Sequence, residues 1–471
     1  MLNYAYFLLL LTHITVVTSF LSSYTTNKMN KFNLKMMNKL EKLTVDPITK
    51  FEGEITLPGS KSLSNRVLLL SALAEGTTLV ENLLDSADIR YMLNALEQLN
   101  IPLDEDREGK TVKVTGCGGP INVDNKAELN LGNAGTAMRP LAGVLCAGNG
   151  NFVLDGVPRM RERPIIDLID GLNQLGVDVT CSDTGCPPVL INAKGIEGGS
   201  ASISGQISSQ FLSALLMTGP LAKGPIELNI KDELMSAPYV HMTMQLIRKF
   251  GGDVTSEQDK VFKVSPSTYK SPGSVFIEGD ASSASYFLAG AAIMGGPVTV
   301  YGCGSESVQG DARFARVLEK MGATVEYTPN SITVSRDPNV QLQGVDEDCG
   351  DIPDVAMTLA VVGLFAKGET RIRNVYNWRV KETERMVAMV NELTKLGVET
   401  EEGRDYLVVQ GMADVSKLNP NVEIETYDDH RVAMCFSLAA CAGVPVTILD
   451  PGCTSKTFPD YFDRLNSMTK I

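Results

Sequence analysis

The segment GLNQLGVDV (171–179) shows the pattern that decides the fold: apolar residues at helical spacing, then a glycine, then a short extended run. The pattern returns in NALEQLNIPL (94–103), QLIRKFGGDV (245–254), RVLEKMGATV (316–325) and NELTKLGVET (391–400). The break residues Asn100, Gly176, Gly251, Gly322 and Gly397 are 76, 75, 71 and 75 residues apart. Glycine at this place is typical of a helix C-cap that leads into a strand. A period of this length indicates a repeated α/β unit.

Each period also contains a second helical stretch and short β-branched runs, such as KVFKV (260–264) and SITVS (331–335). We therefore expect about two helices and three or four strands in each unit. Residues 43–471 would hold about six units, or three for each of two similar globular domains. A cleft between two such domains is a usual place for a ligand.

The composition indicates a large folded core. The chain has 471 residues, of which 44 % are hydrophobic and 21 % charged, so it is not disordered, collagen-like or a coiled coil. The net charge of −14 disfavours nucleic-acid binding, but an anionic small substrate remains compatible with it where basic side chains converge. The nine cysteines form no CxxC pair and no zinc-finger spacing, so we expect reduced thiols and no metal. Nothing in the sequence calls for an organic cofactor.

Residues 1–42 are predicted to be a presequence made of a signal peptide and a transit peptide. The apolar run YAYFLLLLTHITVV (4–17) suits a signal-peptide core and is short for a membrane span, although no Lys or Arg precedes it. The stretch 20–40 is rich in Ser, Thr, Asn and Lys and has no acidic residue, as in transit peptides. With Phe20 at the junction, this leader resembles those of proteins imported into the stroma of secondary plastids. Simple secretion and a membrane anchor are the alternatives.

Several polar motifs in the first half of the chain favour anion binding. LPGSKSLSNR (57–66) places two cations and a hydroxyl within ten residues, and its spacing departs from that of a P-loop. LGNAGTAMRPL (131–141) has small residues that let backbone N–H groups face a small anion at a helix start. GVPRMRERPI (156–165) packs Arg159, Arg161 and Arg163 into five residues of an acidic protein.

The second half supplies carboxylates and further cations. GDIPDVAMTLA (350–360) carries Asp354 ahead of an apolar helix, and NWRVKETER (377–385) is expected to present its charges on one helical face. The candidate residues here are Asp354, Lys381, Glu382, Arg385, Arg431 and Lys456. A tight turn or a solvated surface would explain each motif alone. Together, cations from both halves and two carboxylates suit two anionic substrates and proton transfer in a closing cleft.

The amino-acid sequences of these motifs resemble those of the 5-enolpyruvylshikimate-3-phosphate synthase family, the 3-phosphoshikimate 1-carboxyvinyltransferases. The resemblance covers residues 43–471, and the motifs follow one another in the same order as in the family. It is nearest to the glyphosate-sensitive plant and enterobacterial members. Further matching segments are ISSQFLSALLM (207–217), EGDASSASYFLAGAA (278–292), DDHRVAMCFSLAA (428–440) and KTFPDYF (456–462).

The resemblance implies two inverse α/β domains, each built from three βαβαββ units around buried parallel helices. The chain would cross between the domains near Leu57–Ser60 and Ser274–Asp280. One domain would then span 60–276, and the other would combine 43–59 with 277–471.

The resemblance also implies the reaction: the enolpyruvyl group of phosphoenolpyruvate moves to the 5-hydroxyl of shikimate 3-phosphate, and phosphate is released. Asp354 is expected to act as base and Glu382 as the acid at C3, with Lys61 near both. Shikimate 3-phosphate is expected to contact Lys61, Ser62, Arg66, Ser208, Ser209, Gln210, Ser236, Tyr239, Asp354, Asn377 and Lys381. Phosphoenolpyruvate is expected to contact Lys61, Asn133, Gly135, Arg163, Gln210, Arg385, Arg431 and Lys456. No cofactor, nucleic acid or membrane is implied for the mature protein, and a monomer is expected.

The main alternative is the related UDP-N-acetylglucosamine 1-carboxyvinyltransferase, which shares the fold and phosphoenolpyruvate. That enzyme normally carries a reactive cysteine on a mobile loop, and no matching loop is found here, while NWRVKETER and SSQF favour the shikimate enzyme. A kinase is disfavoured because the P-loop spacing is broken. A non-catalytic relative would be expected to lose Lys61, Asp354 or Glu382, and all three are present.

Overall fold

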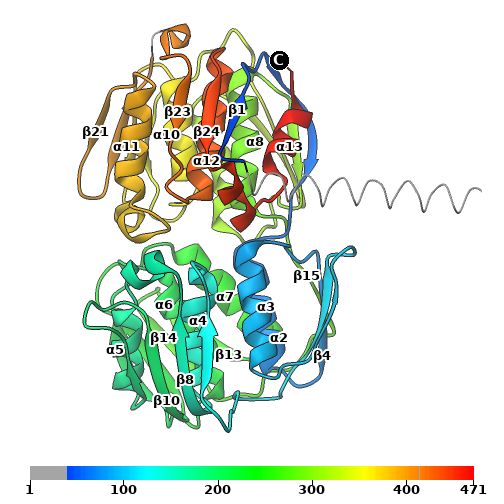
Figure 1. The fold of residues 1–471 in the computed structure, drawn as a ribbon, viewed down its shortest axis with the longest axis vertical. Coiled ribbons are helices and arrows are strands. Elements are labelled where there is room, and N and C mark those ends of the chain that lie inside the picture. The colour runs from blue at the N-terminus through cyan, green and yellow to red at the C-terminus, as the bar shows by residue number, and fades with distance from the viewer. Residues whose placement is uncertain (1–39, 413, 471) are drawn as a thin grey trace, which may run out of the picture.

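The computed structural model describes residues 40–412 and 414–470. The chain forms two halves stacked along the long axis of the molecule, each with its own hydrophobic core (Figure 1). One core draws its residues from between Leu63 and Ile277, and the other from Val45–Leu57 together with Ala281–Met468. The predicted fold class, two similar α/β domains, is confirmed. We propose that the two cores mark domains 60–276 and 43–59 with 277–471.

The strands divide between the two halves. Those of the first half are β4 (Thr77–Glu81), β5 (Leu103–Asp106), β6 (Thr111–Thr115), β7 (Ala127–Asn130), β8 (Asn149–Asp155), β9 (Asp178–Thr180), β10 (Val189–Lys194), β11 (Gly199–Ile203), β12 (Ile226–Ile230), β13 (Asp253–Glu257), β14 (Val261–Ser265) and β15 (Ser274–Phe276). Those of the second half are β1 (Lys42–Val45), β2 (Lys50–Phe51), β3 (Gly53–Thr56), β16 (Val298–Tyr301), β17 (Thr324–Thr328), β18 (Ser331–Ser335), β19 (Asp346–Asp348), β20 (Glu369–Arg373), β21 (Thr400–Glu402), β22 (Leu407–Gln410), β23 (Val422–Ile424), β24 (Val446–Leu449) and β25 (Thr469–Lys470).

One sheet arrangement recurs in both halves. An edge strand pairs in parallel with its neighbour, and two antiparallel strands follow, as in the orders β7-β8-β10-β9 and β11-β12-β14-β13. The sheets β15-β4-β6-β5, β3-β16-β18-β17 and β19-β20-β22-β21 repeat it, and β23-β24-β1 repeats it with three strands. This repetition is the structural form of the period seen in the sequence.

Each sheet is accompanied by a buried helix and an outer helix. The buried helices are α2 (Lys61–Leu73), α4 (Gly135–Cys146), α6 (Ser209–Thr218), α8 (Ala281–Met294), α10 (Ala356–Leu364) and α12 (His430–Ser437). The outer helices are α3 (Ala87–Gln98), α5 (Ile166–Gln174), α7 (Ala237–Lys249), α9 (Phe314–Lys320), α11 (Arg385–Lys395) and α13 (Tyr461–Met468). Short 3₁₀ turns are η1 (Pro158–Glu162), η2 (Gly219–Leu221), η3 (Gly310–Arg313), η4 (Tyr376–Val380), η5 (Val415–Lys417), η6 (Leu438–Ala442) and η7 (Pro451–Lys456). A helix that is apolar on all sides, such as α10, lies in the core, and an amphipathic one covers it.

The break residues of the sequence repeat end the outer helices. Asn100, Gly176, Gly251, Gly322 and Gly397 follow the C-caps of α3, α5, α7, α9 and α11, with φ values of 61°, 82°, 83°, 109° and 85°. Glycine adopts this left-handed backbone without the steric cost of a Cβ atom. The predicted helix-to-strand turns are therefore confirmed at all five positions.

The N-terminal strands belong to the second half, although the first half follows them in the chain. Strand β3 pairs in parallel with β16, and β1 pairs antiparallel with β24. Lys42, the last residue of the predicted presequence, opens β1, and residues 1–39 of that segment lie outside the described part of the chain.

The chain crosses between the halves twice, and the two crossings touch. Gly59 and Gly279 form an isolated β-bridge, with the Ser60 N–H donating to the Glu278 carbonyl at 2.8 Å. A Cβ atom at Gly59 would lie 2.0 Å from the backbone oxygen of Asn82. Glycine is therefore required for this close approach.

We expect Phe51→Ala to destabilise the second core strongly. Phe51 is 1 % exposed, and its ring packs edge-on against Phe287 with centroids 6.4 Å apart. Truncating a buried phenylalanine lowers the free energy of unfolding by about 3–5 kcal/mol, which urea unfolding followed by circular dichroism would measure. Phe276→Ala is the matched control: Phe276 is 63 % exposed, so its loss should change the free energy by less than about 1 kcal/mol. If Phe51→Ala lowered the free energy of unfolding no more than Phe276→Ala, the N-terminal segment would not anchor the second core.

Candidate active site

A cavity lies where the two halves meet, and an interface between domains is a usual place for a small-molecule site. Its lining contains Thr136 and Ile207 and all but four of the residues predicted from the sequence: Lys61, Ser62, Arg66, Arg163, Ser208, Ser209, Gln210, Ser236, Tyr239, Asp354, Asn377, Lys381, Glu382 and Arg431. Of the other four, Asn133 and Lys456 line a neighbouring cavity, Gly135 adjoins Thr136, and Arg385 contacts two lining carboxylates. Segments far apart in the sequence thus meet at one place.

Helix N-termini from both halves supply many of these residues. Lys61, Gly135 and Arg385 are the first residues of α2, α4 and α11, and Arg431 is the second of α12. Ser208 caps α6 by accepting a hydrogen bond from the Gln210 N–H at 3.2 Å. The free N–H groups and the positive dipole end of a helix both favour a bound anion.

Arg385 organises the carboxylates of the second half. Its Nη1 donates to Asp354 Oδ1 at 2.9 Å, its Nη2 to Glu382 Oε2 at 2.9 Å, and its Nε to Asp429 Oδ2 at 2.7 Å. Arg431 Nη2 donates to the second oxygen of Asp354 at 3.0 Å. Asp354 and Glu382 are therefore held at defined positions on one side of the cavity.

The cations around these two carboxylates keep them ionised. Burial alone would raise the pKa of Asp354, but Arg431, Lys381 and Arg385 outweigh it and hold that pKa well below its usual value. Burial would also raise the pKa of Glu382, and Arg385, Arg163 and Lys456 bring it well below its usual value. At neutral pH both groups are carboxylates in this structure.

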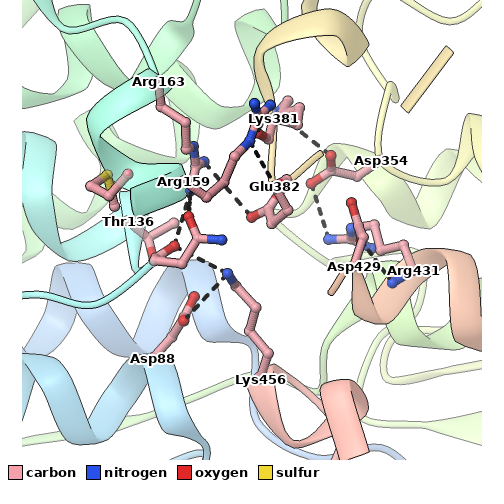
Figure 2. Close-up of polar contacts among 12 residues, drawn as sticks. Asp88, Thr136, Arg159, Arg163, Asp354, Lys381, Glu382, Asp429, Arg431 and Lys456 are labelled. Atoms are coloured by element: carbon pink, nitrogen blue, oxygen red, sulfur yellow. Dashed lines mark hydrogen bonds and ion pairs between the residues drawn. The ribbon is translucent and has the colours of Figure 1, made fainter. Parts of the chain in front are cut away.

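A second cluster of charges spans the two halves next to the cavity. Lys456, from η7 of the second half, donates to the backbone carbonyl of Asn133 in the first half at 3.1 Å. Arg163 Nη1 donates to the side-chain oxygen of Asn133 at 2.9 Å, and its Nη2 lies 3.8 Å from Glu382 Oε1. Asp88 Oδ2 lies 3.1 Å from Lys61 Nζ. Asp88 Oδ1 lies 3.9 Å from Lys456 Nζ (Figure 2). Asp88 thus brings the two predicted lysines together.

Adding a side chain at Gly135 would disturb this cluster. A Cβ atom there would lie 2.5 Å from Arg139 Nη1 and 2.8 Å from Arg163 Nη2. The absence of a side chain at Gly135 therefore leaves room for Arg163 beside the start of α4.

The opposite side of the cavity is also formed by both halves. The Tyr239 hydroxyl on α7 donates to Asp311 Oδ2 in η3 at 3.0 Å, and the Ser236 N–H donates to the Gly350 carbonyl at 2.9 Å. Burial raises the pKa of Asp311 to about 6, and the charge of Asp354 adds to the increase. Burial lowers the pKa of Arg66 to about 10, so this guanidinium stays charged at neutral pH.

Some buried polar atoms around the cavity have no hydrogen-bond partner within the described protein. They include Asn377 Oδ1, Asn133 Nδ2 and Arg163 Nε. A buried polar atom without a partner is unfavourable by roughly 1–3 kcal/mol. A polar ligand that satisfied these atoms would recover that free energy.

Two expectations about local structure are wrong. Lys381 and Glu382 do not lie on a helical face with Arg385, because they belong to the connection between η4 and α11. Arg161 does not face the cavity: its side chain is 56 % exposed and pairs with Asp155 of its own half. Of the arginines in 156–165, the cavity is lined by Arg163.

The structure adds residues that the sequence reasoning missed: Asp88, Thr136, Asp311, Asp429 and His430. Asp429 and His430 stand beside Arg431 in a motif already singled out, and that proximity was the available signal. Burial and the nearby charge of Lys61 hold the pKa of His430 well below its usual value, so its ring is neutral. For Asp88 and Asp311 no local motif points to the cavity.

All nine cysteines are free. Among the described residues, no group of three or more His, Cys, Asp or Glu side chains could hold a metal ion. In the same part of the chain, no helix has the length and apolar character needed to cross a membrane.

Comparison with known proteins gives a consistent result. The family model described as EPSP synthase (3-phosphoshikimate 1-carboxyvinyltransferase) matches residues 45–465. The chain is 56 % identical over 447 residues to the chloroplastic 3-phosphoshikimate 1-carboxyvinyltransferase of Arabidopsis thaliana, covering 92 % of this chain and 85 % of the relative. It is 52 % identical over 432 residues to the enzyme of the same name from Vibrio atlanticus, covering 91 % of this chain and 100 % of the relative.

The solved structure of EPSP synthase from Acinetobacter baumannii matches with a TM-score of 0.75 and 26 % identity, covering 91 % of this chain and 98 % of that one. The agreement of fold and sequence extends over almost the whole described chain. The chain therefore belongs to the EPSP synthase (3-phosphoshikimate 1-carboxyvinyltransferase) family.

Proposed function

We propose that this protein transfers the enolpyruvyl group of phosphoenolpyruvate to the 5-hydroxyl of shikimate 3-phosphate and releases inorganic phosphate. The observation that carries the proposal is the cleft itself, where cations from both halves surround Asp354 and Glu382. Two phosphorylated substrates need such a concentration of positive charge, and the addition and elimination steps need groups that exchange protons. The relatives at 52–56 % identity carry the name of this activity.

We place shikimate 3-phosphate on the side of the cavity formed by α2, α6 and α7. The serines and Gln210 at the start of α6, with Arg66 and Lys381, supply hydrogen bonds and positive charge there. The proposed contacts are Lys61, Ser62, Arg66, Ser208, Ser209, Gln210, Ser236, Tyr239, Asp354, Asn377 and Lys381. Asn377 Oδ1, which has no hydrogen-bond partner among the described residues, would accept a hydrogen bond from a substrate hydroxyl.

We place phosphoenolpyruvate beside the start of α4. Arg163 and Lys456 both donate hydrogen bonds to Asn133 there. Lys61 is held nearby by its ion pair with Asp88. The proposed contacts are Lys61, Asn133, Gly135, Arg163, Gln210, Arg385, Arg431 and Lys456. Bidentate pairing with arginine would hold the carboxylate and phosphate groups in orientation.

In the first step the 5-hydroxyl oxygen bonds to C2 of phosphoenolpyruvate while C3 gains a proton. In the second, the C2–O bond to phosphate breaks and C3 loses a proton, which restores the double bond. We assign Asp354 to accept the hydroxyl proton, because Arg431 and Arg385 keep it ionised. We assign Glu382 to deliver the proton to C3 and then to take it back. The anionic groups of phosphoenolpyruvate would neutralise the cations around Glu382, so that this carboxylate takes up a proton in the complex. The proton that Asp354 accepts from the hydroxyl leaves with the released phosphate, and we assign Lys61 to stabilise the developing charge.

We propose that the protein acts as a monomer, as the family resemblance implies; the two halves of one chain together supply the lining of the cavity. No observation in the structure favours the alternative activity on UDP-N-acetylglucosamine, and the family and its named relatives point to the shikimate substrate.

Asp354→Asn and Glu382→Gln should each lower kcat by at least about one-hundredfold, the usual scale for the loss of general acid–base help. Both changes keep the side-chain volume and remove the ability to exchange a proton. The measurement is phosphate release from phosphoenolpyruvate in the presence and absence of shikimate 3-phosphate.

Asp351→Asn is the matched control for these two variants. Asp351 lies three residues before Asp354, is 48 % exposed and pairs with Arg313 at 3.3 Å. It should keep the turnover of the unmodified protein. Near-normal turnover in Asp354→Asn or Glu382→Gln would remove that residue from its assigned role.

The affinity for phosphoenolpyruvate should rise as the pH falls, and Glu382→Gln should lose part of this dependence. The anionic groups of phosphoenolpyruvate would neutralise the cations that hold the pKa of Glu382 well below its usual value. That pKa then rises on binding, so binding takes up a proton and is favoured at lower pH. Titration of the phosphate group of phosphoenolpyruvate is common to both proteins and cancels in the comparison.

The single tryptophan provides the readout for this experiment. Trp378 is buried in η4, and its Nε1 donates to the Pro353 carbonyl at 2.7 Å, next to Asp354. Fluorescence titrations at several pH values would use a shikimate 3-phosphate analogue that lacks the 5-hydroxyl, so that no turnover occurs. The same pH dependence in both proteins would show that Glu382 gains no proton on binding.

We propose that the mature protein works in the stroma of a secondary plastid, delivered by residues 1–42 as a two-part leader. The Arabidopsis relative is named as chloroplastic, which supports the plastid. The sequence of the leader supports the two-step route.

A fluorescent protein fused after residue 42 should reach the stroma in a host with secondary plastids. Fusion after residue 20 should stop in an earlier secretory compartment, because the transit segment is then missing. Fluorescence microscopy of both fusions makes the test, and cytosolic signal from both would contradict the leader.

A further inference from the structure

The three arginines of segment 156–165 point to three different places. Arg161 pairs with Asp155 of its own half, and Arg163 lines the cavity. Arg159 crosses to the second half, where its Nε donates to the Glu382 carbonyl at 3.1 Å and its Nη2 to the Lys381 carbonyl at 3.0 Å. Figure 2 shows this side chain lying between Arg163 and Lys381.

We propose that Arg159 is a positioning residue, which holds Lys381 and Glu382 in their working places by binding their backbone carbonyls across the cleft. This inference rests on the proposed function. Arg159 does not touch the reacting atoms in this arrangement; it acts through the segment that carries them.

The segment 381–384 has little regular structure of its own. It joins the end of η4 at Val380 to the start of α11 at Arg385. Within the described residues, the carbonyls of Lys381 and Glu382 accept no hydrogen bonds other than those from Arg159. A backbone held by two bonds from one planar guanidinium has a defined direction, and so do the side chains that leave it.

The first half fixes the position of Arg159 firmly. It lies in η1, whose Pro158 restricts the backbone and whose Met160 is fully buried. Its third nitrogen, Nη1, donates to Glu162 Oε2 at 2.8 Å, which leaves Nε and Nη2 for the two carbonyls.

The two bonds exist only when the halves are in contact, because donor and acceptors belong to different halves. Placement of Glu382 is then coupled to closure of the cleft. An open enzyme would leave the segment 381–384 without its support, and the carboxylate would reach its place as the substrates draw the halves together.

The test replaces Arg159 with alanine and with lysine. A single ammonium group cannot reproduce the paired bonds, so both variants should lose at least about tenfold in kcat, while the KM for shikimate 3-phosphate rises by a smaller factor. Guanidinium ion at millimolar concentration should restore part of the activity of Arg159→Ala, because this side chain is 29 % exposed and the site is accessible. A merely structural role would not give this rescue.

Arg161→Ala is the matched control, since it removes an arginine of the same turn that does not cross the cleft. It should keep the kcat of the unmodified protein and show no response to guanidinium ion. Circular dichroism would verify that all variants are folded. If Arg159→Ala did not fold, Arg159→Lys would still test the positioning role.

Two outcomes overturn the inference: a kcat of the folded Arg159 variants within about twofold of the unmodified protein, or an equal loss in Arg161→Ala. Failure of the unmodified protein to release phosphate with shikimate 3-phosphate would instead count against the proposed function. The two failures are therefore distinguishable.

Discussion

Arg385 lies beneath the cleft with 1 % of its side chain exposed, and its guanidinium binds the carboxylates of Asp354, Glu382 and Asp429. Three negative groups this close together would raise one another's pKa values without a cation between them. Removing one partner of such a buried cluster leaves uncompensated charge, which is strongly destabilising. The planar fork also fixes the directions of the oxygen atoms. Arg385 therefore places the proposed base and acid together, and it contributes to their ionisation alongside Arg431 and Lys381 at Asp354 and Arg163 and Lys456 at Glu382.

The repeated unit explains why the cleft is positive at so many points. Buried helices such as α2 and α4 in one half, and α12 in the other, begin at the cavity because each unit repeats the same connection from strand to helix. Their N–H groups and dipoles add to the charges of Lys61 and Arg431. Two such faces repel each other, and Asp354, Glu382 and Asp88 reduce that repulsion in the closed form. An anionic substrate between the faces would reduce it further and favour closure.

The sequence predicted the features that depend on local order. The glycines at 176, 251, 322 and 397 mark helix ends because only the backbone around them decides their conformation. Most residues that line the cavity were predicted from the resemblance, since they stand in continuous motifs. Asp88 and Asp311 were missed because the residues they contact are distant in the sequence. Asp88 pairs with Lys61, 27 residues earlier, and Asp311 accepts from Tyr239, 72 residues earlier. The role of Arg159 was out of reach for the same reason, because its acceptors are backbone carbonyls more than 200 residues away.

The insertion of the first half between β3 and the rest of the second half has a consequence for biosynthesis. Thr44 of β1 bonds to Thr447 of β24, 403 residues later. During translation the first half emerges complete and can fold, while β1 and β3 wait for partners that have not yet been made. Closing such a long loop has an entropic cost, which is offset only when the strand partners of the finished chain are present. A ribosome-bound intermediate would thus expose three short unpaired strands, since β2 also pairs with β25 near the end of the chain. The last helix to be synthesised would complete the half that was begun first.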